Sequence, residues 1–547
     1  MLITFLFVAV TAKLVYIAAV SAGSLRVKAL EQWYRDVPIR AERGAISDRN
    51  GVALAKSESA YTLYARPVEI PLKEQAARIL SEKLELNYAR LKEKLNSKSS
   101  EITLKRGVTK EKMLEIIDSG VPGIYVSEDL KRVYPYGDFL TQVLGFTSSD
   151  VVGQTGLERY LENYLKGVDG AVLTASDLVG RRLPEGETYY REGVKGADVT
   201  LNIDANIQSI VENAVKRAML NHSAKGVGAI VMECDTGAVL AMAESPSFDL
   251  NAVPRDDVSL PLEVSRPKLI SDVFEPGSTF KIVTSALAIE AGLVNDEKRY
   301  YCGGSVTVDN QKIRCWRAKG HGSQTFTEGV KNSCNCVFVQ AALELGLDRF
   351  YDGMEAFGVT EKTGIELPGE GTGLTIPKGS VKNVDLARIG FGQAVAMTPI
   401  ELLSAACTAV NGGYKVTPKL VAKIEDESGI LYTCGSDKGK RVISESTSKT
   451  LRAMLEAVVL EGSGKNAAVY GVRVGGKTGT AQKYEDGKIA RGKYVSTFIG
   501  FAPADEPKYI ALFMVDEPVG AYYGGVVAAP YVGEIYQNMF EYLGYMS

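Results

Sequence analysis

The chain has 547 residues, of which 45% are hydrophobic and 24% are charged, and its formal net charge is −3. This length exceeds that of one ordinary domain, and the apolar content is typical of globular proteins with full-sized cores. The small net charge argues against a nucleic-acid-binding protein, which normally carries a basic stripe.

The first predicted element is an apolar helix. Residues 2–22 are almost wholly apolar, which is long enough to cross roughly 30 Å of hydrocarbon as a helix. Lys13 interrupts the segment and would cost about 2.5–3.5 kcal/mol at mid-span unless its ammonium reaches the interface. The small residues at 20–22 also fit the cleavage site of a secretory signal peptide. We predict a single transmembrane anchor over residues 1–22, with a cleaved signal as the alternative. In both cases the rest of the chain leaves the cytoplasm.

Two larger regions follow. Residues 23–195 form a mixed region with a hairpin turn at Asn50-Gly51, and a polar, glycine-containing stretch over residues 184–197 marks its boundary. In residues 196–547, Asp204 is expected to cap a helix whose apolar residues recur at intervals of three and four. Hairpins are expected over residues 226–242 and 497–514. Strands at both ends of this region with helices between them predict an α+β domain, an antiparallel sheet flanked by helices.

The main candidate for chemistry is the motif Ser278-x-x-Lys281. It follows the turn Pro276-Gly277 and opens a helix, so both side chains would lie on one face near the positive end of the helix dipole. A lysine kept neutral by burial can take the proton of a serine hydroxyl and so make it nucleophilic. Two further Ser-x-x-Lys matches, at residues 265–268 and 446–449, are interpreted as a proline-interrupted segment and as helix capping.

Two other motifs complete the set. Ser333-Cys334-Asn335 offers a hydroxyl that could relay a proton and an amide that could bind a peptide group. The segment over residues 475–481, with Lys477 and Thr478 after two glycines, offers an open strand edge together with an ammonium and hydroxyls for a carboxylate. A second Lys-Thr-Gly, at residues 362–364, lacks the paired glycines and is interpreted as structural.

Histidine and cysteine usage narrows the chemistry further. The only histidines are His222 and His321, so a serine–histidine–acid triad would have to use one of these two. The seven cysteines show no metal-ligand spacing, so a zinc site is not expected. We also expect no cofactor.

Taken together, the three motifs in this order match the serine acyltransferase set of penicillin-binding proteins and β-lactamases. Over nearly its whole length the chain resembles class B penicillin-binding proteins. Residues 43–51 are similar to the signature of their N-terminal pedestal, and residues 390–393 followed by Thr398-Pro399 are similar to another family stretch. Residues 314–322 and 332–335 resemble the sporulation branch, with division-specific relatives as close competitors. The resemblance implies a transpeptidase domain over residues 196–547 on a dimerisation-type pedestal over residues 23–195.

By this resemblance, the catalytic residues are Ser278, Lys281, Ser333 and Lys477. Ser278 would attack the penultimate D-Ala carbonyl of a stem peptide, with Lys281 as general base and Lys477 holding Lys281 neutral. Ser333 would help to return the proton to the leaving D-Ala.

The resemblance also implies the substrate-binding residues, which are Asn335, Thr478, Gly479 and Thr480. Asn335 would bind substrate backbone, and Thr478 and Thr480 would receive the terminal carboxylate together with Lys477. The backbone N–H groups of Ser278 and Thr480 would form the oxyanion hole.

The implied partners are peptidoglycan stem peptides, β-lactams as inhibitors and a glycan polymerase, with no nucleic acid. The enzyme would be anchored in the cell membrane with its catalytic domain outside the cytoplasm. Three other functions stay open: a β-lactamase or β-lactam sensor, a D,D-carboxypeptidase, and a non-catalytic cell-wall scaffold with a β-lactam-binding site.

Cysteine suggests one further feature. Cys334 lies between two candidate site residues, and outside the cytoplasm it could form a disulfide with Cys315 that distorts the site. The two are therefore a candidate redox pair, and small buried thiols are the alternative.

Overall fold

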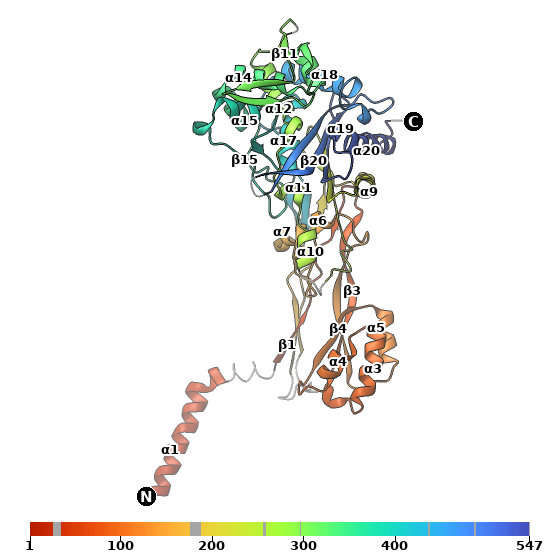
Figure 1. Cartoon of the computed structure of the whole chain (residues 1–547). Coiled ribbons are helices and arrows are strands. Elements are labelled where there is room, and N and C mark those ends of the chain that lie inside the picture. Colours follow the sequence, from red (N-terminus) through yellow and green to blue (C-terminus); the bar gives the residue numbers. More distant parts are fainter. Residues whose placement is uncertain are drawn as a thin grey trace. The chain divides into compact units, whose positions relative to one another are not determined.

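The structure is a computed structural model that describes residues 1–25, 34–175, 188–254, 259–295, 297–435, 438–485 and 488–545. Residues 184–187 of the predicted boundary stretch lie outside this part. The chain divides into two compact units (Figure 1). Unit 1 comprises residues 1–44, 56–133 and 163–197, and unit 2 comprises residues 45–55, 134–162 and 198–547. The domain limits at residues 22 and 195 stay predictions.

The N-terminal segment is helical. Helix α1 (Leu2–Tyr16) continues through a π-helical turn (Ile17–Ser21). The span Ile3–Leu25 has 23 residues and a mean hydropathy of 2.2, and none of its most apolar window is buried against the rest of the chain. At 1.5 Å per residue such a helix is long enough to cross a bilayer, and an N-terminal signal sequence would have the same properties.

Unit 1 contains a sheet covered by short helices. Strand β3 (Ala53–Ala65) pairs antiparallel with β4 (Ile102–Val108) and β5 (Ile124–Val133). Helices α3 (Lys73–Leu84), α4 (Tyr88–Leu95) and α5 (Lys110–Ile117) bury leucines and isoleucines in the core of this sheet. A separate antiparallel sheet has the order β1 (Tyr34–Ile39), β6 (Gly170–Ala175), β7 (Thr188–Arg191).

Unit 2 is built on a five-stranded antiparallel sheet in the order β10-β9-β21-β20-β19. The strands are β9 (Gly226–Glu233), β10 (Val239–Ser245), β19 (Gly475–Glu485), β20 (Lys488–Ala502) and β21 (Tyr509–Asp516). Strands β9 and β10 form the first predicted hairpin, and β20 and β21 form the second. The predicted α+β class is confirmed for this unit.

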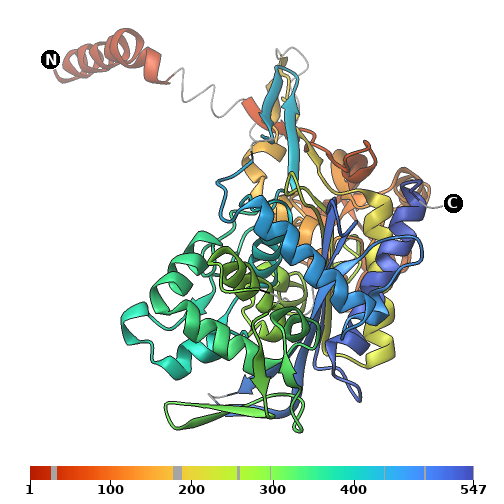
Figure 2. The same ribbon diagram turned by 90° about the horizontal axis from the view of Figure 1, so that it is seen from above.

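Helices cover both faces of this sheet. Helices α9 (Ala205–His222) and α20 (Ala529–Tyr542) lie on one side, and the green helical region with α12 (Lys281–Glu290) and α14 (Asn335–Leu345) lies on the other (Figure 2). The Asp204 side chain accepts hydrogen bonds from the backbone N–H groups of Asn206 and Ile207, which confirms the predicted cap of α9.

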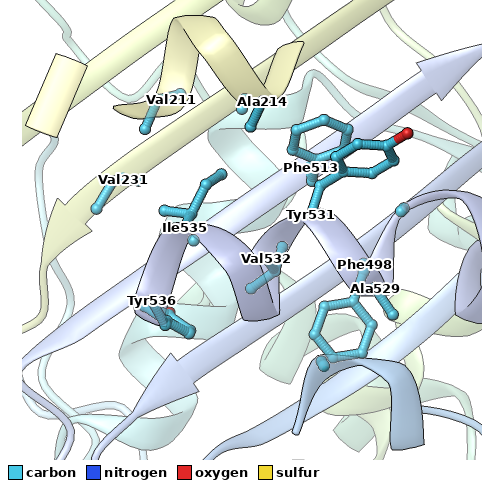
Figure 3. Packing of buried hydrophobic residues seen from close by; sticks show 14 of the residues in the cluster. Val211, Ala214, Val231, Phe498, Phe513, Ala529, Tyr531, Val532, Ile535 and Tyr536 are labelled. Atoms are coloured by element: carbon cyan, nitrogen blue, oxygen red, sulfur yellow. The ribbon is translucent and has the colours of Figure 1, made fainter. Parts of the chain in front are cut away.

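The apolar core of unit 2 lies between the sheet and helices α9 and α20 (Figure 3). Phe498, Phe513 and Tyr536 are fully buried in it. The Phe513 ring stacks on Tyr531 with 5.0 Å between ring centroids. Burial of each such side chain stabilises the fold by roughly 1.5–3 kcal/mol, so this core holds in place the strands that carry the site.

Candidate active site

Ser278 lies at the start of helix α12. A short 3-10 turn (Gly277–Thr279) leads directly into the helix, as the turn-then-helix pattern predicts. Ser278 is partly exposed and lines a cavity, whereas the next two residues, Thr279 and Phe280, are buried. Within the described part of the chain, the Ser278 hydroxyl makes no side-chain hydrogen bond. It is therefore free to meet a ligand that enters the cavity.

Lys281 lies one turn later and is buried, with 1% of its surface exposed. Its Nζ donates to the Ser333 carbonyl oxygen at 2.9 Å and to Asn335 Oδ1 at 2.8 Å, and lies 3.3 Å from Ser333 Oγ. The ammonium also lies 5.1 Å from the centre of the Phe338 ring. These contacts join the Ser-x-x-Lys helix to the Ser-x-Asn segment, which lies 52 residues away in the chain.

The Ser-x-Asn segment is a tight turn between helices α13 (Phe326–Lys331) and α14. Ser333 has φ 51°, in the left-handed region that costs a residue with a side chain of order 1–3 kcal/mol. Asn335 is the first residue of α14, and its Nδ2 donates to the carbonyl oxygen of Arg314 at 3.1 Å. Both ends of the Asn335 amide are thus fixed, and the turn directs Ser333 Oγ toward the two lysines.

Lys477 approaches the same hydroxyl from strand β19. It is fully buried, and its Nζ donates to Ser333 Oγ at 2.9 Å. Ser333 Oγ therefore bridges the ammonium groups of Lys281 and Lys477. In the described part of the chain neither lysine forms an ion pair with a carboxylate, which leaves two buried cations with only neutral acceptors.

Burial away from carboxylates lowers the pKa of both lysines. Desolvation lowers the pKa of Lys281 to about 8. Desolvation, together with the positive charge of Lys281, holds the pKa of Lys477 well below its usual range. The pair can therefore hold a neutral amine next to a hydroxyl near physiological pH. This is the condition for general base chemistry without a histidine.

Strand β19 is the edge strand of the sheet that the structure describes, with β20 as its neighbour. Gly479 is required here because a Cβ would lie 2.2 Å from Thr497 Oγ1 and 3.0 Å from Thr279 Cγ2. Thr480 Oγ1 accepts a hydrogen bond from the backbone N–H of Gly524 at 3.0 Å, and Thr478 Oγ1 lies 3.0 Å from Ser463 Oγ. Close packing therefore brings the motif strand against the helix that carries Ser278.

All three motifs border one cavity of about 630 Å³. It is lined by Ser278, Ser333, Asn335, Thr478, Gly479 and Thr480, while Lys281 and Lys477 lie behind Ser333. Other lining residues were not singled out from the sequence as site residues: Trp316, Lys465, Asn466, Tyr523 and Val526. Gln393 also lines the cavity. Residues 390–393, and residues 314–322 with Trp316, were noted only as family resemblances.

The look-alike motifs lie elsewhere. Ser265 is buried with its hydroxyl directed at the Pro261 carbonyl oxygen, and Thr363 donates to the Glu370 carboxylate. For the Ser-x-x-Lys match at residues 446–449, the prediction that it caps a helix is wrong in one detail. The cap of helix α18 (Glu445–Leu460) is Ser444, whose Oγ accepts from Thr447 N–H, so Ser446 lies inside the first turn.

The predicted redox pair is close in space. Cys315 Sγ and Cys334 Sγ lie 4.0 Å apart, and both thiols are buried and free. Whether they form a disulfide stays a prediction.

A partly exposed serine at a helix start, two buried lysines and an open strand edge define a serine acyltransferase site. Residues 227–537 match the penicillin binding protein transpeptidase domain, and residues 38–201 match the penicillin-binding protein dimerisation domain. The chain belongs to the class B penicillin-binding proteins.

Two curated relatives illustrate the likeness. Stage V sporulation protein D of Bacillus subtilis is 39% identical over 98% of this chain and 84% of its own length. A probable peptidoglycan D,D-transpeptidase, PenA, of Neisseria meningitidis is 31% identical over 100% of this chain and 92% of its own length.

Solved structures agree with the fold. A peptidoglycan synthetase of Bifidobacterium adolescentis aligns with TM-score 0.74 and 25% identity, covering 93% of this chain and 97% of that one. Penicillin binding protein 3 of Mycobacterium tuberculosis, solved in complex with aztreonam, aligns with TM-score 0.72 and 26% identity over the same shares.

Proposed function

We propose that this protein is a peptidoglycan D,D-transpeptidase that cross-links stem peptides through an acyl-enzyme on Ser278, in septal or spore cell-wall synthesis. The observation that carries the proposal is the bridge from Lys281 and Lys477 to Ser333 Oγ beside a partly exposed serine. Names of relatives that are peptidoglycan D,D-transpeptidases support the same reaction.

The first half-reaction uses the helix start. Ser278 Oγ attacks the penultimate D-Ala carbonyl and transfers its proton to neutral Lys281. The ester forms as the terminal D-Ala leaves, and Ser333 relays a proton to the departing amine. The backbone N–H groups of Ser278 and Thr480 stabilise the oxyanion, a contribution of about 3–4 kcal/mol per donor.

The second half-reaction uses the strand edge. An amine from a neighbouring stem peptide attacks the ester carbonyl and transfers its proton to Lys281. The bond from the carbonyl carbon to Ser278 Oγ breaks, and Lys281 returns a proton to Oγ, which restores the free serine. Before acylation, the donor peptide lies along β19, with its terminal carboxylate at Thr478, Thr480 and Lys477 and its backbone at Asn335. After acylation, the carboxylate departs with the released D-Ala, and the rest of the donor stays on β19. Gly479 lets β19 pack closely against the turn that carries Ser278. Thr478 and Thr480 border the cavity, which supports this arrangement.

Several wider assignments belong to the same proposal. The helix Ile3–Leu25 anchors the chain, and the catalytic unit works outside the cytoplasm beside a glycan polymerase. The limits of the anchor, pedestal and transpeptidase domains are residues 1–22, 23–195 and 196–547. β-Lactams resemble the D-Ala-D-Ala end and are trapped on Ser278.

Product analysis separates this function from its rivals. The full-length protein in detergent, with its partner polymerase and lipid-linked disaccharide pentapeptide, should form cross-linked dimers and release free D-Ala. Release of D-Ala without dimers would identify a D,D-carboxypeptidase. Absence of both products, with penicillin still bound, would identify a scaffold.

A further inference from the structure

Four cysteines of unit 2 converge on one point. Cys302 ends strand β11 (Tyr300–Cys302), and Cys315 follows strand β13 (Gln311–Arg314). Cys334 and Cys336 stand at the cap and in the first turn of α14. Their four Sγ atoms all lie within 4.8 Å of one another, and each residue is at most 6% exposed. All four thiols are free.

The rest of the chain shows what an ordinary buried thiol does here. Cys407 Sγ donates to the Cys234 carbonyl oxygen at 3.5 Å, so this buried thiol has a backbone acceptor. The cluster differs, because four sulfurs converge within 4.8 Å of one another. In a tetrahedral zinc site with Zn–S bonds of about 2.3 Å, sulfurs lie about 3.8 Å apart. The separation of 4.0 Å between Cys315 Sγ and Cys334 Sγ is already close to that distance.

We propose that Cys302, Cys315, Cys334 and Cys336 bind one Zn²⁺ ion as four thiolates, at a structural site directly behind the catalytic turn. Binding displaces the thiol protons to solvent, and no redox step is involved. Four buried sulfur ligands leave no open position for water, which is the arrangement of a structural zinc site and not of a catalytic one.

His321 supports the assignment. Its Nδ1 lies 3.6 Å from Cys302 Sγ and 3.7 Å from Cys315 Sγ, so an N–H at this position can donate to two metal-bound sulfurs. Hydrogen bonds of this kind stabilise thiolate ligands and fix the ligand geometry.

The site would fix the catalytic turn in place. Cys334 lies between Ser333 and Asn335, and Asn335 Nδ2 donates to the carbonyl oxygen of Arg314, the neighbour of Cys315. Trp316 Nε1 donates to the Asn332 carbonyl oxygen at 3.0 Å, and Trp316 lines the cavity. One ion would therefore tie the strands around residues 300–316 to the turn that presents Ser333 to the two lysines.

The test measures metal binding directly. Full-length protein, purified in detergent without oxygen, is reduced, made metal-free and titrated with Zn²⁺ and separately with Co²⁺. We expect one tightly bound equivalent of zinc, and a cobalt form with the intense sulfur-to-metal charge-transfer absorption of tetrahedral thiolate coordination. Cys336→Ser should weaken zinc binding by at least about 100-fold, and Cys434→Ser, which removes a thiol outside the cluster, should not change it.

Cys302→Ser is the second ligand variant and should weaken zinc binding as Cys336→Ser does. Both variants distinguish the zinc site from the predicted redox pair, because that pair includes neither Cys302 nor Cys336. If Cys302→Ser and Cys336→Ser fail to fold, the cobalt spectrum of the unsubstituted protein decides alone. The proposal is overturned if the reduced protein takes up less than about 0.1 equivalent of zinc, or if zinc binds equally well to folded Cys336→Ser. It is also overturned if the cobalt form shows no thiolate absorption. Zinc binding does not depend on Ser278, so Ser278→Ala should keep the full equivalent even if the transpeptidase proposal fails.

Discussion

Unit 2 has two interiors with opposite physical character. Between the sheet and helices α9 and α20, burial removes mainly apolar surface and the fold gains stability. Behind the cavity, burial encloses Lys281 and Lys477 with a hydroxyl and carbonyl oxygens but no carboxylate in the described part of the chain. Burial of the two lysines costs stability, and it also produces reactivity. Desolvation lowers the pKa of a buried lysine, and the neutral amine can then act as a base. The stabilising free energy of the apolar core offsets the cost of burying the two lysines.

The largest expected effect separates these two roles at one residue. Lys281→Met should lower the second-order rate of penicillin acylation by about 10³–10⁴-fold, because the general base is lost. The same substitution should raise the free energy of unfolding by about 1–4 kcal/mol, because an unpaired buried cation is replaced by an apolar chain of similar size. Stopped-flow acylation and urea unfolding of the same preparation check both effects. A variant that is both slower and less stable would contradict the comparison.

A substitution in the apolar core should lower stability and leave the acylation rate nearly unchanged. Phe513→Ala should lower the free energy of unfolding by about 3–5 kcal/mol, because it opens a cavity beside Tyr531 in a fully buried core. Acylation by the fraction that remains folded should change little. Measurement at low temperature, with the folded fraction counted by circular dichroism, tests this. A loss of acylation as large as that of Lys281→Met would show that the two interiors are not separable.

The pH dependence sharpens the same point. With the pKa of Lys281 lowered to about 8, the acylation rate should rise by about 100-fold between pH 6 and pH 9, as the base loses its proton. Stability should follow the same direction. The folded state binds fewer protons than the unfolded state between the two pKa values, so stability rises with pH from about 8 to the unfolded lysine value. It is lost again as pH falls through the folded pKa. Lys281→Met, measured beside the parent, should show a smaller rise in stability, because the contribution of Lys281 is lost and that of Lys477 remains.

The smallest effect concerns the cavity wall. Ser463→Ala removes the partner of Thr478 Oγ1, which lies 3.0 Å away, but leaves Thr478 in place. We expect a loss of at most about 10-fold in acylation, equivalent to one neutral hydrogen bond of about 1 kcal/mol. Steady-state labelling with a fluorescent penicillin measures it. A loss beyond 100-fold would mean that Ser463 contacts the ligand itself.

Local signals explain which elements could be predicted from the sequence. Residues close together in the chain determine each of the elements that were predicted correctly. These elements are the cap at Asp204, the hairpins of β9–β10 and β20–β21, and the turn before Ser278. The three motifs were recognisable for the same reason. We predicted that they meet because one reaction would use all three, and in the structure they meet at Ser333 Oγ.

Long-range packing explains what could not be predicted. Trp316 and Tyr523 reach the cavity from loops far apart in the sequence. The spacing of Cys302, Cys315, Cys334 and Cys336 does not indicate a cluster, because strands and a helix bring them together in space. The left-handed backbone at Ser333 has no signal either, since a serine there is held by the surrounding helices and not by its own preference.

Intact-mass spectrometry after exposure to benzylpenicillin tests the central claim most directly. The reduced full-length protein should gain the mass of one penicilloyl group that persists for hours, and Ser278→Ala should gain none, a loss of at least about 10⁴-fold in acylation. Ser333→Ala, which keeps the nucleophile, serves as the matched control and should acylate slowly. An adduct of equal amount on Ser278→Ala, or none on the reduced parent protein, would contradict the assignment of Ser278 as the nucleophile.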